Sequence, residues 1–310
     1  MDLTKGKPIE ITDKPLFDEY FKKYPPDISE LTFTNLFIWR NYYNSSFLEY
    51  EDHLLIFSPD YFKTHKKQGP NNPETLFFVP PIGPNPAQMI LNIFESLIHV
   101  EIHRVPDVIV NELENNEKRK ALKIDIINDR NNWDYVYEKD KLIALSGANL
   151  YRKRKWLKKF EEKFPNSEFH LLTEDWLEHC KKLQIQWCDM NECRMHEDLM
   201  EEQKAIDEAI EYYHDLKYLG GLLLVDGTCI AYTMGEHMNP ATGVIHIEKA
   251  LINYEGSYQA INKLFLQHCC EDVTFINREQ DLGDPGLRQA KDSYNPHHMV
   301  KKSILCRTAI

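Results

Sequence analysis

The chain passes twice through the same order of elements: a hairpin, a strand, a helix and a further strand. In the first half, SFLEY and LLIFS flank a short turn at residues 51–53, and TLFFVP at 75–80 follows as a third strand. The stretch 85–100 opens on Asn-Pro and repeats apolar residues at helical spacing, which predicts a helix. DVIVN at 107–111 then reads as a strand.

The second half repeats this series. GLLLV and TCIAYTMGE flank Asp226-Gly227, a strong hairpin signal, and VIHIEKAL at 244–251 is the third strand. EGSYQAINKLFLQHC at 255–269 has helical periodicity, and DVTFIN at 272–277 returns as a strand. Each strand–helix–strand connection is long enough for a right-handed crossover, which gives a mixed sheet.

This duplication predicts an α+β protein with two similar lobes, each a mixed twisted sheet flanked by helices. We place the first lobe at residues 1–145 and the second at 146–310, the second beginning with a helical section at about 146–216. That section holds the basic run YRKRKWLKK at 151–159, an acidic stretch at 189–211 and a helix expected from about His196 to His214. The two runs differ in sign, so charge patterning is more informative than the net charge of −12.

The composition and the N-terminal sequence bear on the location of the protein and on whether it binds a metal. The N-terminus has no signal-like apolar region, and no apolar run approaches the ~18 residues that cross a bilayer. Seven cysteines are too few and too irregular for a disulfide framework, so we expect a reducing cytoplasm, with a peripheral position at the inner face of the membrane as the alternative. Cys188, Cys193 and His196 lack ordinary zinc spacing, and we expect no metal.

Four ordered motifs carry a family resemblance. They are LTFTNLFIWRNYY at 31–43, LSGANLYRKRKWLKKFEEKFP at 145–165, VIHIEKA at 244–250 and NREQDLGDPGLRQAKDSYNP at 277–296. Together they resemble the family named after the C-terminal domain of phosphatidylglycerol lysyltransferase. The repeated unit is similar to the tandem-GNAT aminoacyltransferases.

The resemblance implies a tandem-GNAT fold and transfer of an aminoacyl group from aminoacyl-tRNA to a hydroxyl or amine. Full-length lysyltransferases carry a large membrane domain that this sequence does not show, so an anionic lipid and a small soluble acceptor both stay open. A non-catalytic binding module on the same fold is a further alternative, and a homodimer is compatible with the sequence.

Acetyl-CoA is disfavoured as a cofactor. Ordinary GNAT enzymes resemble one another in a Gln/Arg-x-x-Gly-x-Gly/Ala loop that cradles pyrophosphate before a helix. The equivalent segment here is NYEGSYQAI at 253–261, which keeps only Gly256 and adds the negative charge of Glu255. We therefore expect no cofactor, with an acyl-CoA-dependent N-acyltransferase as the alternative.

Charged residues follow the strand that ends at Asn277, where a crevice site is expected. Asp284 and Pro285 should start a helix that places Arg288 and Lys291 on one face. This pair could bind a carboxylate, a phosphate or the tRNA terminus, or could pair internally. The predicted substrate-binding residues are Glu236, Lys249, Asn277, Arg278, Asp281, Arg288, Lys291 and Tyr294.

The strand VIHIEKA supplies the predicted chemistry. Alternation puts His246 and Glu248 on one face and Lys249 on the other. Aminoacyl transfer needs a base, and Glu248 is our candidate, with His246 and Glu279 as further catalytic candidates. The alternative for His246 is a buried histidine satisfied by a neighbour. Strand pairing could also bring Glu236 near Glu248, where like charges would raise one pKa.

The basic run at 151–159 predicts a helix with cations on its outer face. A contact with tRNA or another anion would use Arg152, Lys153, Arg154 and Lys155. A merely solvated basic face is the alternative.

Overall fold

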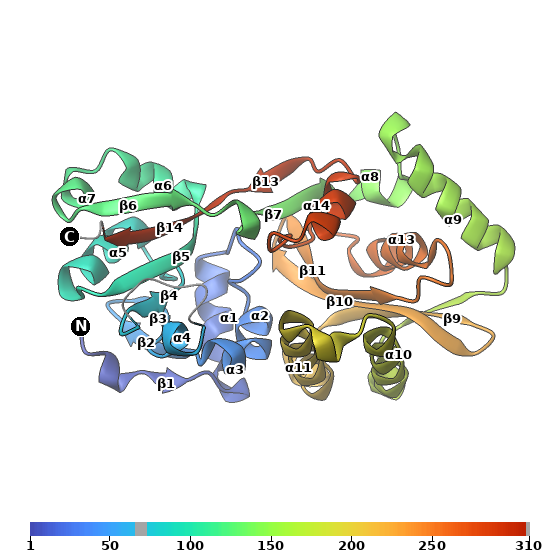
Figure 1. The fold of residues 1–310 in the computed structure, drawn as a ribbon, viewed down its shortest axis with the longest axis horizontal. Coiled ribbons are helices and arrows are strands. Elements are labelled where there is room, and N and C mark those ends of the chain that lie inside the picture. The colour runs from blue at the N-terminus through green and yellow to red at the C-terminus, as the bar shows by residue number, and fades with distance from the viewer. Residues whose placement is uncertain (66–72, 308–310) are drawn as a thin grey trace. The chain divides into compact units, whose positions relative to one another are not determined.

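The computed structural model describes residues 1–65 and 73–307. These form two compact units, Met1–Asp134 with Val300–Ile310, and Tyr135–Met299. Each unit is built on a seven-stranded mixed sheet (Figure 1). The predicted α+β class is confirmed, and the two sheets share one topology.

The first unit orders its strands β1-β2-β3-β4-β5-β14-β6. The hairpin β2–β3 is followed by β4, which pairs parallel to β5. Its strands are β1 (Lys7–Pro8), β2 (Ser46–Tyr50), β3 (His53–Ser58), β4 (Leu76–Phe78), β5 (Val100–Pro106), β6 (Ile124–Asn128) and β14 (Lys302–Arg307). Its helices are α1 (Lys14–Lys23), α2 (Phe33–Ile38), α3 (Arg40–Tyr43), α4 (Tyr61–Thr64), α5 (Pro86–Ser96), α6 (Asp107–Glu114) and α7 (Glu117–Ala121).

The second unit repeats this order as β8-β9-β10-β11-β12-β7-β13. Its strands are β7 (Asp134–Glu138), β8 (Glu168–Leu171), β9 (Leu219–Val225), β10 (Thr228–Asn239), β11 (Thr242–Ala250), β12 (Phe275–Asn277) and β13 (His298–Val300). Its helices are α8 (Lys139–Ala144), α9 (Tyr151–Lys163), α10 (Leu177–Met190), α11 (Glu197–Glu211), α12 (Tyr213–Leu216), α13 (Ser257–Cys269) and α14 (Pro285–Asp292).

The repeat is visible in local structure. Both hairpins turn through two residues with positive φ, Glu51-Asp52 and Asp226-Gly227, as primed turns require. The expected strand at 107–111 is wrong, because these residues begin helix α6 and the strand is β5. Pro106 ends that strand, and the apolar residues Ile109, Val110 and Leu113 then recur at helical spacing.

The two halves exchange their last strands. In the first sheet, β14 from the C-terminus lies between β5 and β6, and in the second, β7 from mid-chain lies between β12 and β13. Residues 135–145 therefore join the second unit and residues 300–310 the first, unlike our boundary at residue 145. A boundary drawn along the sequence cannot represent an exchanged strand.

Each sheet has its own core. In the first unit, α5 and α6 pack on β3, β5 and β14 through residues such as Phe94, Leu113 and Leu305. In the second, Figure 1 shows α13 on one side of the sheet and α10 and α11 on the other. This agrees with β10, whose central residues are buried in a continuous run, as a strand covered on both faces requires. Phe160, Phe265 and Ile276 lie in the core of the second unit.

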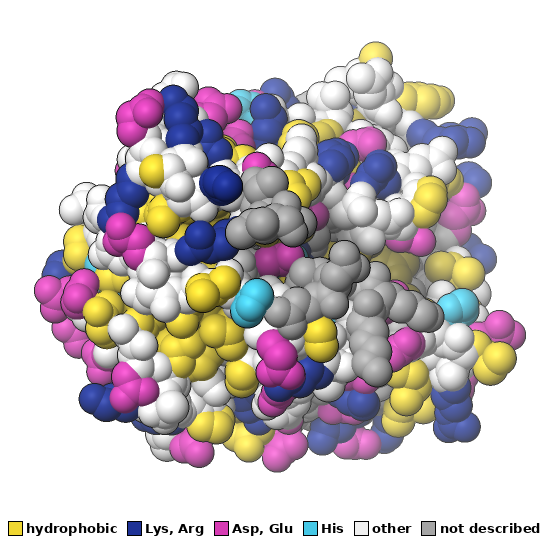
Figure 2. All heavy atoms as spheres, turned by 60° about the vertical axis from the view of Figure 1, so that its left-hand side comes forward, with side chains coloured by type: hydrophobic (Ala, Val, Ile, Leu, Met, Phe, Trp, Pro, Cys, Tyr) yellow, Lys and Arg dark blue, Asp and Glu magenta, His cyan; other side chains and the backbone are white. Residues whose placement is uncertain are grey.

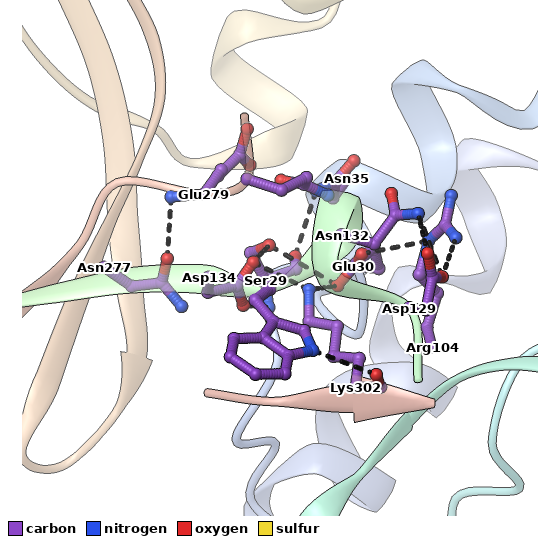
Figure 3. A network of polar contacts seen from close by, with 12 residues as sticks. Ser29, Glu30, Asn35, Arg104, Asp129, Asn132, Asp134, Asn277, Glu279 and Lys302 are labelled. Carbon is purple, nitrogen blue, oxygen red and sulfur yellow. Dashed lines mark hydrogen bonds and ion pairs between the residues drawn. The ribbon is translucent and has the colours of Figure 1, made fainter. Parts of the chain in front are cut away.

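A buried ion cluster anchors β14 in the first unit. The Lys302 ammonium is fully buried and lies 2.5 Å from Glu30 and 2.7 Å from Asp134 (Figure 3). Ser29 donates to Asp134 from both its backbone N–H and its hydroxyl, at 2.9 Å each. Arg104 adds ion pairs to Glu30 at 3.2 Å and to Asp129 at 3.0 Å. Residues far apart in the sequence are thereby held at one point.

Charges are mixed on the surface as well. Figure 2 shows acidic and basic side chains interspersed over the face that it draws, without a single-sign field. Such a face does not suit general nucleic-acid binding, which needs clustered cations.

Removing the buried ammonium should destabilise the protein strongly. Lys302→Met removes the buried cation that Glu30 and Asp134 share, while Arg104 still pairs with Glu30. Removing one partner of a buried ion pair typically costs about 3–5 kcal/mol. Lys301→Met is the matched control because Lys301 is exposed, and it should change the free energy of unfolding by less than about 0.5 kcal/mol. Urea unfolding measures both, and equal effects of the two substitutions would contradict this role for Lys302.

Candidate functional site

The site forms where β11 and β12 stop pairing. These strands run parallel and pair at three positions, from Thr242 opposite Phe275 to Val244 opposite Asn277. β12 ends at Asn277, whereas β11 continues to Ala250. Side chains of β11 beyond Val244 therefore meet the segment that follows β12, at the carboxyl end of a strand, where open sheets commonly place binding sites.

His246 on β11 lies between two glutamates. Its Nε2 is 2.8 Å from Glu236 Oε1, and its Nδ1 is 2.7 Å from Glu279 Oε1. The imidazole is 2% exposed, whereas the two carboxylates are 18% and 22% exposed. Only the charged ring can donate from both nitrogens. Burial alone would lower the pKa of His246, but the hydrogen bonds and charges of Glu236 and Glu279 outweigh it and raise the pKa to about 10.

The histidine is thus an imidazolium that holds two carboxylates, and the triad carries a net charge of −1. Neither ring nitrogen is available to accept a proton, so the geometry favours the satisfied histidine over the catalytic one. Glu236 and Glu279 are the members of the triad that reach the surface.

A bulge in β10 aims Glu236 at His246. The register between β10 and β11 shifts between Met234 and Gly235, which puts Glu236 opposite Val244. A Cβ atom at Gly235 would lie 2.2 Å from the Val244 carbonyl oxygen, so the close approach requires glycine. The expected approach of Glu236 to Glu248 is therefore wrong, because Glu248 lies opposite Thr233.

Glu248 is held in an ion pair. Its Oε1 accepts from Arg278 Nη2 at 2.7 Å, and its Oε2 accepts from Asn262 of α13 at 2.8 Å. Burial alone would lower the pKa of Arg278, and the charge of Glu248 raises it instead. Because both oxygens of Glu248 are engaged, the geometry favours a structural anion here over the predicted general base.

Lys249 has other partners, as the predicted alternation requires. Its ammonium bonds Glu202 of α11 at 2.8 Å and lies 3.7 Å from the ring centroid of Trp187 on α10. It is buried under these helices, so it is not among the residues around His246 and Glu248.

The loop after β12 is bent and tightly held. Glu279 and Leu282 have positive φ, and strain of this kind gathers at functional sites. Gly283 also has positive φ, which glycine adopts without strain. Asp281 is fully buried and accepts hydrogen bonds from Tyr135, the Gly283 N–H and two nitrogens of Arg288. Burial alone would raise the pKa of Asp281, but these hydrogen bonds hold it well below its usual range.

Arg288 and Lys291, the predicted cation pair of α14, bind the loop that follows β12. Asp284 caps the helix as expected, accepting from the Leu287 N–H at 2.6 Å. Arg288 binds Asp281, and Lys291 donates to the carbonyls of Arg278 and Gln280 at 2.5 Å each. Of the two alternatives for Arg288 and Lys291, the geometry favours internal pairing over substrate binding.

Asn277 and Tyr294 complete the site. The buried Asn277 side chain accepts from the Glu279 N–H at 2.7 Å, which fixes the start of the loop (Figure 3). The Tyr294 hydroxyl accepts from Gln259 at 2.8 Å. Its ring centroid lies 4.2 Å from Lys153 Nζ and 4.9 Å from Arg278 Cζ.

The predicted anion contacts on α9 divide into two pairs. Arg152 and Lys155 are exposed. Arg154 donates to the carbonyls of Leu145 and Gly147, which ties the start of α9 to the preceding turn. Lys153 is half-buried over Tyr294. Only the first pair faces outward as the sequence suggests.

Two of the cysteines form a disulfide that the sequence did not indicate. Cys188 and Cys193 form a disulfide that closes the connection between α10 and α11, although the number and spacing of the cysteines indicated no disulfide framework. Within residues 1–65 and 73–307, no group of three or more His, Cys, Asp or Glu side chains is arranged to hold a metal ion.

Two buried polar atoms at the site have no hydrogen-bond partner within the described part of the chain. They are Arg278 Nη1 and the hydroxyl of Tyr218, whose ring centroid lies 6.2 Å from that of His246. Such atoms are rare in folded proteins and call for a specific explanation. Sequence reasoning missed Tyr218 because a single tyrosine before a strand carries no pattern.

Comparison with known proteins identifies the family. A family model described as phosphatidylglycerol lysyltransferase, C-terminal, matches residues 21–306. The chain belongs to this family. Membership supports a transferase.

Similar proteins support the same fold. An uncharacterised protein of Mycoplasmoides gallisepticum is 23% identical over 249 residues, covering 75% of each chain. A Bacteroides thetaiotaomicron protein of unknown function has a TM-score of 0.86 at 27% identity, covering 98% of this chain and 99% of its own. The C-terminal domain of a putative lysylphosphatidylglycerol synthetase from Agrobacterium fabrum has a TM-score of 0.65 at 10% identity, covering 97% and 93%. The two solved structures share the fold of this chain, in which each unit is a mixed sheet flanked by helices.

His246 should stay charged across the physiological range. Its pKa is raised from 6.5 to about 10, so its stabilising contribution is complete below pH 6.5 and is lost as the pH rises toward 10. The Cε1 proton shift in NMR spectra should stay constant between about pH 6 and 8. A titration centred near the ordinary histidine pKa would contradict the two-carboxylate arrangement.

Proposed function

We propose that this protein transfers an aminoacyl group from aminoacyl-tRNA to a hydroxyl or amine acceptor, and that the second unit binds the aminoacyl end. One observation carries the proposal beyond family membership: the triad of Glu236, His246 and Glu279 has a net negative charge and presents two partly exposed carboxylates. An aminoacyl ester carries a free ammonium beside its reactive carbonyl. A negatively charged, partly desolvated pair of carboxylates suits that group.

The residues can be given roles in the reaction. The nitrogen or oxygen atom of the acceptor attacks the ester carbonyl carbon. The proton on that atom goes to a carboxylate, for which Glu279 is our candidate. Glu236 and the triad charge hold the substrate ammonium. The carbon–oxygen ester bond then breaks, and the departing tRNA oxygen takes the proton back.

Tyr218 is the candidate donor to the developing oxyanion. Its hydroxyl is buried beside the triad with no partner within the described residues. Burial raises the pKa of Tyr218 well above its ordinary value, so the hydroxyl keeps its proton and can donate a hydrogen bond. Glu248 and Arg278 support the site from the neighbouring ion pair.

The acceptor is an anionic lipid or another hydroxyl or amine compound. No helix within residues 1–65 and 73–307 is long and apolar enough to span a bilayer. The exposed Arg152 and Lys155 on α9 are the feature that supports a contact with an anionic substrate or surface.

The segment before α13 supports a donor other than acetyl-CoA. Gly256 has φ of 94°, and a Cβ atom there would lie 2.3 Å from the Trp156 carbonyl oxygen on α9. Glu255 pairs with Lys159 of the same helix at 3.2 Å. The start of α13, where a pyrophosphate would need free N–H groups, is packed against α9.

Transfer can be tested with charged tRNAs bearing radiolabelled amino acids, offered together with lipid and soluble amine acceptors. We expect label to move to an acceptor. Glu279→Gln should slow transfer by roughly 100-fold, the usual contribution of a general base. Glu271→Gln, an exposed neighbour outside the site, is the matched control and should have no effect. If no charged tRNA is consumed or bound, the proposal fails and a non-catalytic module is favoured.

Acetyl-CoA should leave the melting temperature unchanged. A ligand present at about 100 times its Kd stabilises the folded state by roughly 2.7 kcal/mol, which differential scanning fluorimetry detects readily. A clear upward shift at millimolar acetyl-CoA would instead favour the acyl-CoA-dependent reaction.

A further inference from the structure

Two cations meet around Tyr294 with too little negative charge to balance them. Lys153 Nζ and Arg278 Cζ lie 4.2 Å and 4.9 Å from the Tyr294 ring centroid. Glu248 pairs with Arg278 at 2.7 Å. Lys153 has no carboxylate partner within the part of the chain that the structure describes. This corner of the second unit therefore has two positive charges against one negative charge.

Arg278 has an unused donor at this place. Its Nη2 is engaged by Glu248, whereas its Nη1 is buried and has no acceptor among the described residues. A guanidinium presents its N–H groups in a rigid fork, so the position of the second nitrogen is fixed once the first is bonded. A group that accepts at Nη1 must carry an oxygen into this corner.

Among the described residues, Lys153 also lacks a negatively charged partner that would stabilise its ammonium. Its side chain leaves the exposed face of α9 and lies half-buried over Tyr294. Burial first, then the neighbouring charges of Arg278 and Arg152, lower the pKa of Lys153 to about 8. An anion beside this amine would favour its protonated form. The missing acceptor at Arg278 and the missing counter-charge at Lys153 would both be supplied by one negatively charged oxygen group.

We propose that Lys153 and Arg278 form an anion subsite that binds a phosphate ester. Assigning that phosphate to a substrate rests on the proposed aminoacyl transfer, whereas anion binding itself does not. An aminoacyl ester has no free carboxylate, but the nucleotide end of its tRNA carries phosphate, and so does a phospholipid acceptor. The phosphate would contact the positive corner while the ammonium contacts the triad of Glu236, His246 and Glu279.

Selective amine labelling tests the subsite in the intact protein. At about pH 8, an amine whose pKa is lowered to about 8 is roughly half unprotonated, whereas an ordinary lysine is almost fully charged. We expect acetic anhydride to label Lys153 faster than the exposed Lys158, with mass spectrometry quantifying both. Inorganic phosphate, compared with chloride at equal ionic strength, should slow labelling of Lys153 by roughly tenfold and leave Lys158 unchanged, because bound phosphate blocks the amine and favours its charged form.

Phosphate affinity of two single variants gives the second readout. Lys153→Gln should weaken binding of inorganic phosphate, measured by calorimetry, by roughly tenfold. Lys158→Gln, the matched control on the same helix, should bind as the unmodified protein does, because Lys158 is exposed and pairs with Glu162. Adenosine 5′-monophosphate and glycerol 3-phosphate serve as two further probes: tighter binding of the first supports a nucleotide phosphate, and tighter binding of the second supports a lipid headgroup.

The subsite is overturned if none of the three phosphate compounds protects Lys153, or if both variants lose affinity equally, which would mark diffuse surface attraction. Protection without aminoacyl transfer would leave the subsite standing and reject the proposed reaction. Aminoacyl transfer without protection of Lys153 by phosphate would support the proposed reaction and reject the subsite.

Discussion

The Lys302 ammonium, buried between Glu30 and Asp134, fixes the points at which the chain leaves the first unit and returns to it. Asp134 begins β7 and Lys302 begins β14, the two exchanged strands. β7 in turn pairs with β12, and its Tyr135 hydroxyl bonds Asp281 in the loop that carries Glu279. β7 therefore begins at the ion cluster and, within the second unit, contacts both the strand and the loop that position Glu279.

The site itself is built from two groups of charges: the triad of Glu236, His246 and Glu279, and the cluster of Glu248, Arg278 and Lys153. His246 neutralises one of its two glutamates, and Glu248 neutralises Arg278 but not Lys153. Loop and helix cations such as Arg288 and Lys291 are used internally. This arrangement leaves carboxylate charge at the triad and ammonium charge near Tyr294, a polarity that matches an aminoacyl nucleotide.

Much of the fold could be predicted because its signals are local. Hairpin turns such as Asp226-Gly227, the Asp284 cap and the alternation in β11 depend on neighbouring residues, and each has the expected form. Exchange of β7 and β14 could not be predicted, because both strands are short and pair with segments far away in the sequence. The partners of Glu236, Glu248 and Arg288 depended on a bulge and a bent loop, which residue types alone do not determine. No sequence pattern indicated the Cys188–Cys193 bond, or the Tyr218 hydroxyl that has no hydrogen-bond partner among residues 1–65 and 73–307.

The central claim is that one site in the second unit recognises both ends of an aminoacyl nucleotide. A crystal structure with a stable amide analogue of an aminoacyl-adenosine 5′-phosphate tests it most directly. The account predicts the analogue's ammonium within hydrogen-bond distance of Glu236 or Glu279, and its phosphate at Lys153 and Arg278. An analogue bound away from these side chains, or bound with its phosphate at the glutamates' end, would contradict it.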